Sequence, residues 1–196
     1  MKGEVIIGVI IMEVGIKDVE ESNLKDIPET CRGCLYWSFP EEFERTKAEQ
    51  QKYRRELEAK KRQWILQTLA EFGHCGKILY YNNVPVGYAE YGPSSRFPNI
   101  EEYKSQPIGM IENGVVFLSC LVIVDETLRG KSLGEKLLNS VIDDLKKRGF
   151  RAIETYARRG SADNPSGPVE FYLKKGFYLK DETNPFFPIV RLNLSS

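Results

Sequence analysis

The stretch VDETLRGKSLGEKLL, Val124 to Leu138, begins as the end of an apolar strand and continues as an amphipathic helix. Arg129 and Lys131 place two positive charges between the strand and the helix. A short loop that leads into a helix N-terminus attracts anions, because free N–H groups and the positive end of the helix dipole converge there. Ser132 and Glu135 also spell S-x-x-E, the capping box by which a helix satisfies its own first N–H groups. The stretch therefore predicts either a phosphate-binding loop or a self-capped helix.

The segments on either side of this stretch have the patterns of a buried strand and a core-facing helix. Gly114–Val124 is an uninterrupted apolar, β-rich run, which is typical of a strand buried on both faces near the centre of a sheet. From Leu133 to Leu145 the apolar residues recur at helical spacing, and Gly149 follows at a position where helices commonly end. We therefore expect a central strand, a short loop and an amphipathic helix in this order.

Further strands and helices flank this unit in the sequence. Lys77–Gly92 has the pattern of two strands around an Asn-Asn turn, which is a β-hairpin signal. After the central helix, Arg151–Ala157 predicts a strand, Val169–Gly176 a short amphipathic helix and Phe187–Leu194 a last strand. A hairpin followed by alternating strands and helices predicts an α/β fold with a mixed sheet.

The residues before the hairpin are predicted to be mainly helical. Val5–Met12 is a β-branched, apolar run that suits a first strand. Asp18–Glu29 can hold a short helix that ends before Pro28. Glu41–Phe72 contains no Gly or Pro and carries i,i+4 charge pairs, so we expect one long helix with a solvated first half and a docked second half. Pro93–Gly109 is a long polar excursion, and loops of this length are often functional.

Composition limits the class of protein. The 196 residues suit one domain, and 28 Lys plus Arg balance 28 Asp plus Glu, so no bulk charge recruits nucleic acid or an anionic membrane. Val5–Met12 is far shorter than the roughly 20 residues that a membrane-spanning helix requires. Glu13 follows that run where the small-residue cleavage site of a signal peptide would begin. We expect a single-domain cytoplasmic protein, a monomer or homodimer, without nucleic-acid or membrane partners.

The cysteines raise a second, unrelated hypothesis. Cys31 and Cys34 have the C-x-x-C spacing of metal or redox sites, but no second C-x-x-C follows. Only His74 and Cys75 could complete a set of four ligands, and adjacent residues of an extended chain point to opposite sides. Cys120 lies within an apolar run and suits a small core or pocket residue. Reduced structural thiols are the expected state, and zinc binding or redox chemistry are the alternatives.

The motifs of the second half resemble those of the GNAT superfamily of N-acetyltransferases. Its first motif is [Q/R]-x-x-G-x-[G/A] after the fourth strand, and Arg129 and Gly134 match it, whereas Ser132 stands at the position of the first glycine. VEFYLKKGF, which begins at Val169, is similar to the second motif. CRGCLYW, Cys31–Trp37, is similar to a segment of an uncharacterised microbial subgroup of the superfamily.

The resemblance covers residues 78–194 in order and spacing, within one domain spanning 1–196. Residues 15–73 correspond to the family's variable N-terminal helical region. The resemblance implies the GNAT-like acyltransferase fold, in which a central, mostly antiparallel sheet is flanked by helices.

The resemblance also implies acetyl-CoA as the co-substrate. Main-chain groups of Val122 and Val124 would pair with the pantetheine arm, as an added strand does in β-augmentation. Asn164 and Lys175 would contact the arm and the nucleotide end. The pyrophosphate would be held by the loop and the first helical turn: Arg129, Gly130, Lys131, Ser132, Leu133, Gly134 and Glu135. Ser132 would be tolerated if its backbone keeps a helix-start conformation, and we expect it to cap the helix when the site is empty.

Carried over by position, the resemblance implies direct transfer of the acetyl group to a primary amine in a ternary complex. Tyr172 holds the position of the family's frequent general acid and would protonate the departing thiolate, because tyrosine and an alkyl thiol have similar pKa values. A strand N–H near Val122 would stabilise the oxyanion. Leu118 stands where many members have a strand glutamate, so Glu90 and Glu154 are the substitute candidates for the base.

Three hypotheses follow. The first is a GNAT-type N-acetyltransferase that acts on a small-molecule or protein amine and needs no metal. The second is an acyl-CoA-binding module without turnover, suggested by Ser132 and by the missing strand glutamate. The third is a zinc or thiol protein centred on Cys31 and Cys34. The acceptor is not assigned by any of these residues.

Overall fold

The computed structural model describes residues 13–103, 114–160 and 167–194, and this part of the chain contains a seven-stranded mixed sheet. The strands follow the order β1-β2-β3-β4-β5-β7-β6, and neighbours are antiparallel except β4 and β5, which are parallel. Their bounds are β1 Val14–Asp18, β2 Gly76–Tyr81, β3 Val84–Gly92, β4 Val115–Ile123, β5 Ala152–Tyr156, β6 Tyr178–Asp181 and β7 Ile189–Asn193. The predicted α/β fold with a mostly antiparallel sheet is confirmed.

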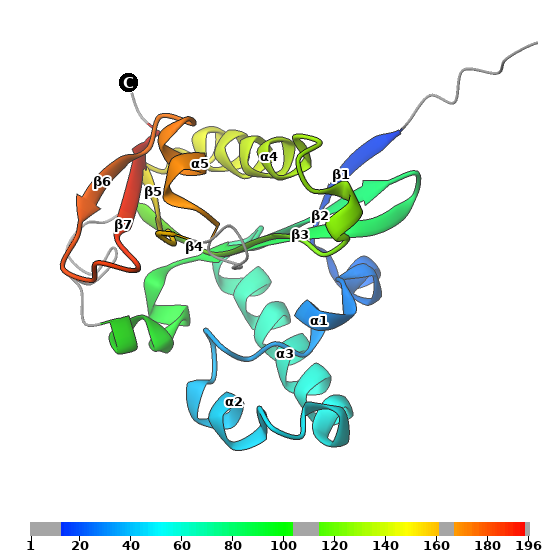
Figure 1. Cartoon of the computed structure of the whole chain (residues 1–196). Coiled ribbons are helices and arrows are strands. Elements are labelled where there is room, and N and C mark those ends of the chain that lie inside the picture. The colour runs from blue at the N-terminus through cyan, green and yellow to red at the C-terminus, as the bar shows by residue number, and fades with distance from the viewer. Residues whose placement is uncertain (1–12, 104–113, 161–166, 195–196) are drawn as a thin grey trace, which may run out of the picture.

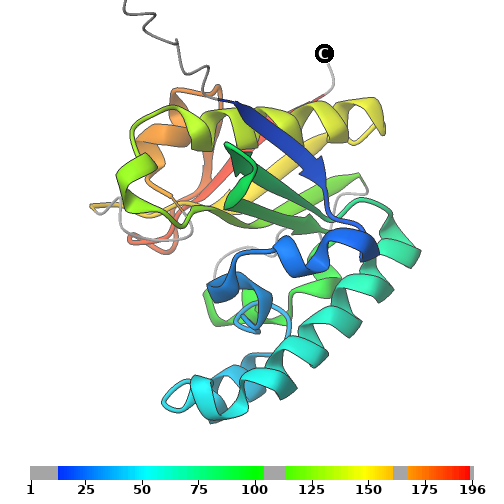
Figure 2. The same ribbon diagram turned by 90° about the vertical axis from the view of Figure 1, so that its right-hand side faces the viewer.

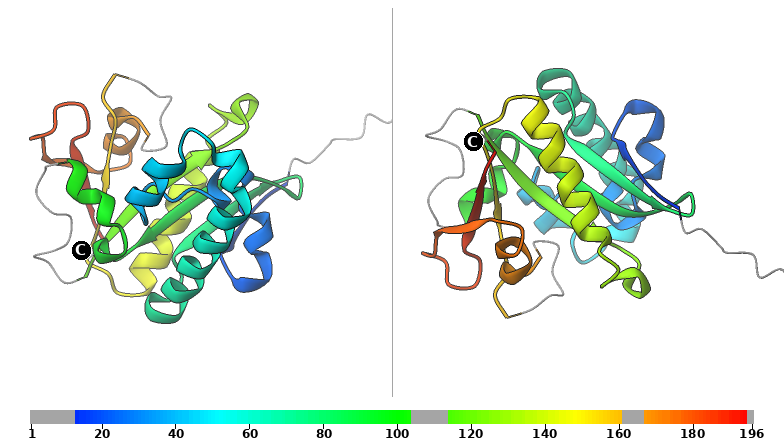
Figure 3. Two further views of the ribbon diagram at one scale, coloured as in Figure 1. Left: turned by 90° about the horizontal axis from the view of Figure 1, so that it is seen from below. Right: turned by 90° about the horizontal axis from the view of Figure 1, so that it is seen from above.

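Helices cover both faces of the sheet. α4 lies across one face together with α5, and α1, α2 and α3 lie on the other (Figure 1, Figure 3). The α-helices are α1 Glu29–Arg32, α2 Pro40–Thr46, α3 Gln50–Phe72, α4 Leu133–Lys147 and α5 Val169–Leu173. Short 3-10 helices span Glu21–Asp26, Ser94–Arg96, Pro98–Tyr103 and Glu126–Leu128. Among the described residues, no helix combines the length and the apolarity that are needed to cross a bilayer.

Each face of the sheet has its own hydrophobic core. On the α4 face, the buried side of α4 packs on apolar side chains of the central strands. The buried residues of α4 are Leu133, Leu137, Leu138, Val141, Ile142 and Leu145. On the α3 face, Trp64 and Ile65 of α3 join an aromatic cluster. Trp37 belongs to that cluster and meets the Phe117 ring edge-on, with 5.1 Å between the ring centroids. The sheet therefore separates two cores, and the strand residues alternate between them.

The long helix predicted over Glu41–Phe72 is interrupted. α2 ends at Thr46 and α3 begins at Gln50, and Figure 2 shows α3 running diagonally beneath the sheet. A turn in which the Glu49 N–H donates to the Thr46 carbonyl, at 2.9 Å, reverses the chain. Ion pairs of Glu42 with Lys60 and of Arg45 with Glu56 then join the two helices. Charged residues that were expected to form ion pairs within one helix therefore form ion pairs between two helices.

The N-terminal predictions are met in part. The strand predicted over Val5–Met12 lies outside the described residues, and the first described strand is β1, one residue after Glu13. The short helix predicted within Asp18–Glu29 is the 3-10 helix Glu21–Asp26, which ends before Pro28 as expected. The four-residue helix α1 and the edge strand β6 were not predicted. Both are shorter than the window in which a periodic pattern becomes visible.

The hairpin and the central helix match their predictions closely. Asn82 and Asn83 have φ of 49° and 65°, the left-handed pair of angles that a two-residue turn between antiparallel strands requires. α4 covers the predicted apolar periodicity, and Gly149 follows its C-terminus with φ of 78°. The central strand and the helix are therefore placed as expected.

The position of the site is decided where β4 separates from β5. The two strands pair only from Val115 to Phe117, although β4 continues to Ile123. Ser119 is an extra residue in β4, since Tyr91 pairs with Leu118 and the preceding residue of β3, Glu90, pairs with Cys120. Such a bulge increases the local twist of a strand. Beyond it, one edge of β4 is left open.

Candidate functional site

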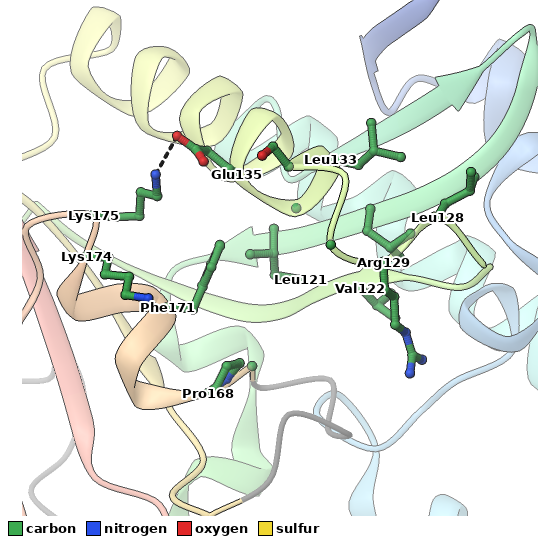
Figure 4. A pocket seen from close by; sticks show the side chains of 15 residues that line it. Leu121, Val122, Leu128, Arg129, Leu133, Glu135, Pro168, Phe171, Lys174 and Lys175 are labelled. Atoms are coloured by element: carbon green, nitrogen blue, oxygen red, sulfur yellow. Dashed lines mark ion pairs between the residues drawn. The ribbon is translucent and has the colours of Figure 1, made fainter. Parts of the chain in front are cut away.

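A cleft of about 520 Å³ lies on the α4 face where β4, α4 and α5 meet (Figure 4). β4 forms one wall, α5 and the residues before it form the other, and the loop before α4 forms the end. The lining residues are Leu121, Val122, Ile123, Leu128, Arg129, Gly130, Ser132, Leu133, Gly134, Glu135, Gly167, Pro168, Phe171, Lys174 and Lys175. The two motifs singled out in the sequence thus line one cavity.

The open edge of β4 offers main-chain groups to this cleft, but not those that were predicted. The Val124 N–H donates to the Val86 carbonyl at 2.9 Å, so it is already used inside the sheet. Because hydrogen-bonding groups alternate between the edges of a strand, Val122 faces β3 as well, whereas Leu121 and Ile123 face the opening. The prediction that Val122 and Val124 present their main chain to the opening is wrong by one residue.

Ser132 does not cap α4. Its φ of 59° and ψ of 15° lie in the left-handed region, and its side chain makes no capping hydrogen bond. Both the helix-start conformation and the capping by Ser132 that were expected for the empty site are therefore wrong. Glycine suits such a position best, since any Cβ is strained there. The left-handed turn rotates the chain so that α4 starts with its N-terminus against the cleft.

The carboxylate of Glu135 forms an ion pair with Lys175 and not the bond to the Ser132 N–H that a capping box would contain. Figure 4 shows the two side chains meeting across the mouth of the cleft, one from α4 and the other from the end of α5. A negative charge on the first turn of a helix is favourable for the helix dipole but repels a bound anion. This pair therefore places an acid and a base at the mouth, where an anionic ligand would arrive.

The cations of the loop point in different directions. The half-exposed Arg129 lines the cleft and lies 3.3 Å from Glu126, while Lys131 lies outside the lining with its ammonium 6.0 Å from the centroid of the Tyr81 ring. Gly130 has φ of 77° and open space where a Cβ would stand, which lets a ligand approach the backbone. Lys174 lines the cleft, although the sequence analysis did not single it out.

Tyr172 is fully buried behind the α5 wall of the cleft. Its hydroxyl lies near Thr155 but makes no hydrogen bond of good geometry. A Cβ added to Gly167, which lines the cleft, would stand 3.5 Å from that hydroxyl, so the two residues are in contact. Burial raises the pKa of Tyr172 above its ordinary value, and the nearby Thr155 hydroxyl only partly offsets this. The phenol is therefore protonated and its hydroxyl is unsatisfied next to the cleft.

Glu90 lies on the α3 face, not in the cleft. It is 2 % exposed, and its carboxylate accepts from the Tyr88 hydroxyl at 2.9 Å and the Ser119 hydroxyl at 3.2 Å. Its ion pair with Lys61 of α3 spans 2.7 Å. Burial alone would lower the pKa of Lys61, but the Glu90 carboxylate outweighs this and raises it, so the ammonium stays charged. The carboxylate is therefore fully occupied by protein partners.

Glu154 is also held by cations on the α3 face. Its Oε1 lies 2.7 Å from the Lys180 ammonium and 2.9 Å from Arg191, and its Oε2 is buried without a hydrogen-bond partner. It lies opposite Phe117, before the strands separate. The structure thus brings neither predicted base into the cleft, and Asn164, the other predicted arm contact, lies outside the described residues.

The cysteines carry free thiols on the α3 side. Burial raises the pKa of Cys31 and of Cys75 to about 12, so both are protonated near neutral pH. Among the described residues, the group of potential metal ligands that converges is Asp18, His74 and Asp144, and no cysteine belongs to it. The described geometry therefore favours reduced structural thiols over a zinc site at Cys31 and Cys34.

The cleft-lining residues that the sequence did not indicate are Leu121, Ile123, Leu128, Gly167, Pro168, Phe171 and Lys174. Figure 4 shows Phe171 of α5 and Leu121 of β4 facing each other inside the cleft. Phe171 and Lys174 are three residues apart on one helical turn, a spacing that already placed them on one side of α5. That signal was available in the sequence but was not used.

Comparison with known proteins identifies the family of this chain. A family model described as the acetyltransferase (GNAT) family matches residues 34–177. An uncharacterised N-acetyltransferase of Methanocaldococcus jannaschii is 33% identical over 70 residues, which are 36% of this chain and only 29% of that protein.

Solved structures of low sequence identity share the fold. The N-acetyltransferase PaiA of Thermoplasma acidophilum in complex with coenzyme A has a TM-score of 0.58 at 17% identity, over 92% of this chain and 99% of that one. YncA of Salmonella typhimurium, a protein described as a putative acetyltransferase with its cofactor acetyl-CoA, has a TM-score of 0.60 at 15% identity, over 93% and 95% of the two chains. Because the family model covers most of the chain, the protein belongs to the acetyltransferase (GNAT) family.

Proposed function

We propose that this protein transfers an acetyl group from acetyl-CoA to a primary amine, by direct attack of the amine on the thioester. The observation that carries this proposal is the cleft, in which an open strand edge, a left-handed loop into a helix N-terminus and a buried tyrosine meet. The structures of PaiA with coenzyme A and of YncA with acetyl-CoA support the choice of donor.

The chemistry of the lining suits the parts of acetyl-CoA. The free N–H groups at the start of α4, with Gly130 and Gly134 leaving the backbone accessible, would hold the pyrophosphate. Main-chain groups of Leu121 and Ile123 would pair with the amides of the pantetheine arm, in the manner of an added strand. Lys174 supplies a positive charge for the nucleotide end, and Lys175 does so once it leaves Glu135.

The reaction follows from groups at the opening of the sheet. The acceptor ammonium first loses a proton to solvent, because the two candidate bases, Glu90 and Glu154, are occupied by cations. The amine nitrogen then bonds to the thioester carbon, and the N–H of Leu121 stabilises the negative oxygen. As the C–S bond breaks, Tyr172 gives its proton to the sulfur, and the proton lost by the new amide nitrogen restores the phenol.

Two measurements test this proposal. Saturating acetyl-CoA is expected to raise the unfolding temperature, because the ligand binds only the folded chain. Release of free CoA thiol across a panel of primary amines then measures turnover. Tyr172→Phe is expected to lower kcat about 100-fold while leaving the dissociation constant of acetyl-CoA within about twofold, as loss of a general acid does.

The outcomes separate the hypotheses. Absence of any thermal shift would contradict the proposal as a whole. A shift without thiol release from any amine would favour a binding module without turnover. Full activity in the Tyr172→Phe variant would show that Tyr172 is not the general acid and would not contradict the proposed acetyl-CoA site.

A further inference from the structure

On the α3 face of the opening, several half-buried, mostly aromatic side chains pack against the core and form what we call the aromatic patch. Cys120 and Val122 border it on β4, and Tyr36, Tyr103 and Phe187 border it farther along. The hydroxyls of Tyr36 and Tyr103 are 2.9 Å apart, and the Tyr103 ring meets Phe187 edge-on at 5.3 Å between centroids. The aromatic patch faces away from the cleft, on the side from which an acceptor can approach the thioester.

Arg158 is a cation beside this patch that no described carboxylate neutralises. Its guanidinium stacks over the Phe187 ring at 4.7 Å, but it forms no ion pair or hydrogen bond with the described residues. Its Nε is buried without a partner. The neighbouring cations differ, since Lys61 is paired with Glu90, and Lys180 and Arg191 are paired with Glu154. A buried, unsatisfied polar atom costs free energy, and a charged one costs most.

The main chain of Arg158 ties this cation to the reaction centre. Its N–H donates to the Gly167 carbonyl at 2.8 Å, and its carbonyl accepts from the Val169 N–H at 3.0 Å. Gly167 lines the cleft and contacts the Tyr172 hydroxyl. Arg158 therefore stands one hydrogen bond from the residue that touches the candidate general acid, while its side chain joins the patch on the other face of the sheet.

We propose that Arg158 binds a carboxylate of the acceptor, so that the acceptor is an amine that also carries a carboxylate, such as an amino acid with an aromatic or long aliphatic side chain. This inference rests on the proposed acetyl transfer and names the class of its second substrate. A guanidinium matches the planar, two-oxygen geometry of a carboxylate. The single positive charge of Arg158 would balance the single carboxylate of the acceptor. The aromatic patch would provide the surface against which the rest of the acceptor packs.

The test compares acceptors that differ by one carboxylate. Thiol release would be measured with tyrosine against tyramine, tryptophan against tryptamine and lysine against cadaverine. The wild-type protein is expected to show a higher kcat/KM for the carboxylate-bearing member of at least one pair, by about 10- to 100-fold, the range of one charged hydrogen bond. Arg158→Gln is expected to lower kcat/KM for that member at least about tenfold more than for its decarboxylated partner.

A matched control is the adjacent Arg159, which is exposed and already paired with Glu182. Arg159→Gln is expected to leave the preference between the two members of each pair as it is in the wild type. Equal losses for both members in the Arg158→Gln variant, or a wild-type preference for the decarboxylated amines, would overturn the inference. Acetyl-CoA binding without turnover of any carboxylate-bearing amine would also overturn it while the donor site stands. Failure to bind acetyl-CoA at all would contradict the proposed function and this inference together.

Discussion

Ser132 holds the left-handed conformation that turns the chain from the β4 loop into α4. In the family motif the same position carries glycine, which adopts this conformation without strain. The serine is kept in place by its neighbours, because Leu133 is buried in the core of the α4 face and the Lys136 N–H donates to the Ser132 carbonyl at 3.1 Å. Helix start and cleft geometry are thus fixed by one strained residue.

The Ser132→Gly variant is expected to be more stable than the wild type by about 0.5–1 kcal/mol. Relief of the left-handed strain contributes roughly 1–2 kcal/mol, and the greater freedom of glycine in the unfolded chain offsets about 0.5–1 kcal/mol of it. The free energy of unfolding in urea measures the difference. Ser140→Gly, within the same helix, is the matched control and is expected to destabilise. A lower free energy of unfolding in the Ser132→Gly variant would contradict the claim that Ser132 is strained.

Individual site residues could be predicted to different degrees. Tyr172 and the loop before α4 follow from local motifs, and the structure places both at the cleft. The conformation of Ser132 was not predictable, because S-x-x-E normally indicates a cap and the left-handed turn depends on where the core holds Leu133. The sequence around Arg158 does not indicate a binding residue, because the buried Nε atom without a partner is visible only in the folded structure.

At the scale of elements, Glu135 of α4 and Lys175, two residues after α5, form an ion pair at the mouth of the cleft. We infer that this pair competes with an anionic ligand, because Lys175 neutralises a carboxylate that the ligand would replace. Removal of Glu135 then frees the cation and takes a negative charge from the helix N-terminus. The pair is half-exposed, so its effect is limited by solvent screening.

Glu135→Gln is accordingly expected to bind CoA more tightly, by about two- to fivefold at low salt. Lys175→Met is expected to bind it more weakly, and Lys136→Met, an exposed neighbour outside the cleft, is the control. Calorimetric titration at two salt concentrations measures these affinities, and the differences should shrink as salt screens the charges. Weaker binding by Glu135→Gln would show that this carboxylate helps to hold the ligand instead.

α3 and β3 are joined by the buried pair of Lys61 and Glu90. Lys61 occupies the buried stripe of α3 between Leu57 and Trp64, where helical periodicity alone places an apolar residue. Glu90 in turn holds Ser119, the bulged residue of β4, through its carboxylate and its carbonyl. The pair therefore supports the bulge beside which the strands separate.

Removing one partner of this pair is expected to destabilise the protein far more than replacing both partners by uncharged residues. Lys61→Met or Glu90→Gln alone leaves an unpaired buried charge and should lower the free energy of unfolding by about 3–5 kcal/mol. The free energy of unfolding of the double variant should lie within about 1 kcal/mol of the wild-type value. Urea unfolding measures the three values. The double variant is also expected to retain turnover with the wild-type dependence on pH. Loss of its activity in a folded protein would restore Glu90 to the role of base.

Most elements were predictable because their patterns are local. The hairpin is marked by Asn82 and Asn83, and α4 by an apolar stripe that matches its buried face. The register between β3 and β4 is not local, since the extra residue Ser119 shifts every residue after it to the other edge. Val122 and Val124 were predicted from their positions in the family motif, and these positions alone do not show which edge of β4 each residue faces.

At the scale of the whole molecule, one seven-stranded sheet of the described residues separates the cleft from the aromatic patch. In the proposed reaction the donor binds on the first side and the acceptor on the second. The cleft opens on the α4 face, the aromatic patch with Arg158 lies on the α3 face, and the two meet where β4 leaves β5. This arrangement supports the proposed direct transfer in a ternary complex, because a donor in the cleft and an acceptor on the patch would reach the same gap from opposite sides.

Amide hydrogen exchange resolved by residue, with and without saturating acetyl-CoA, tests this account most directly. It predicts added protection of the N–H groups of Leu121 and Ile123 and of the first turn of α4, because the ligand becomes their hydrogen-bond partner. Val124, whose N–H already bonds to Val86, should change little. Protection at Val124 instead, or no change at either Leu121 or Ile123 under saturating ligand, would contradict it.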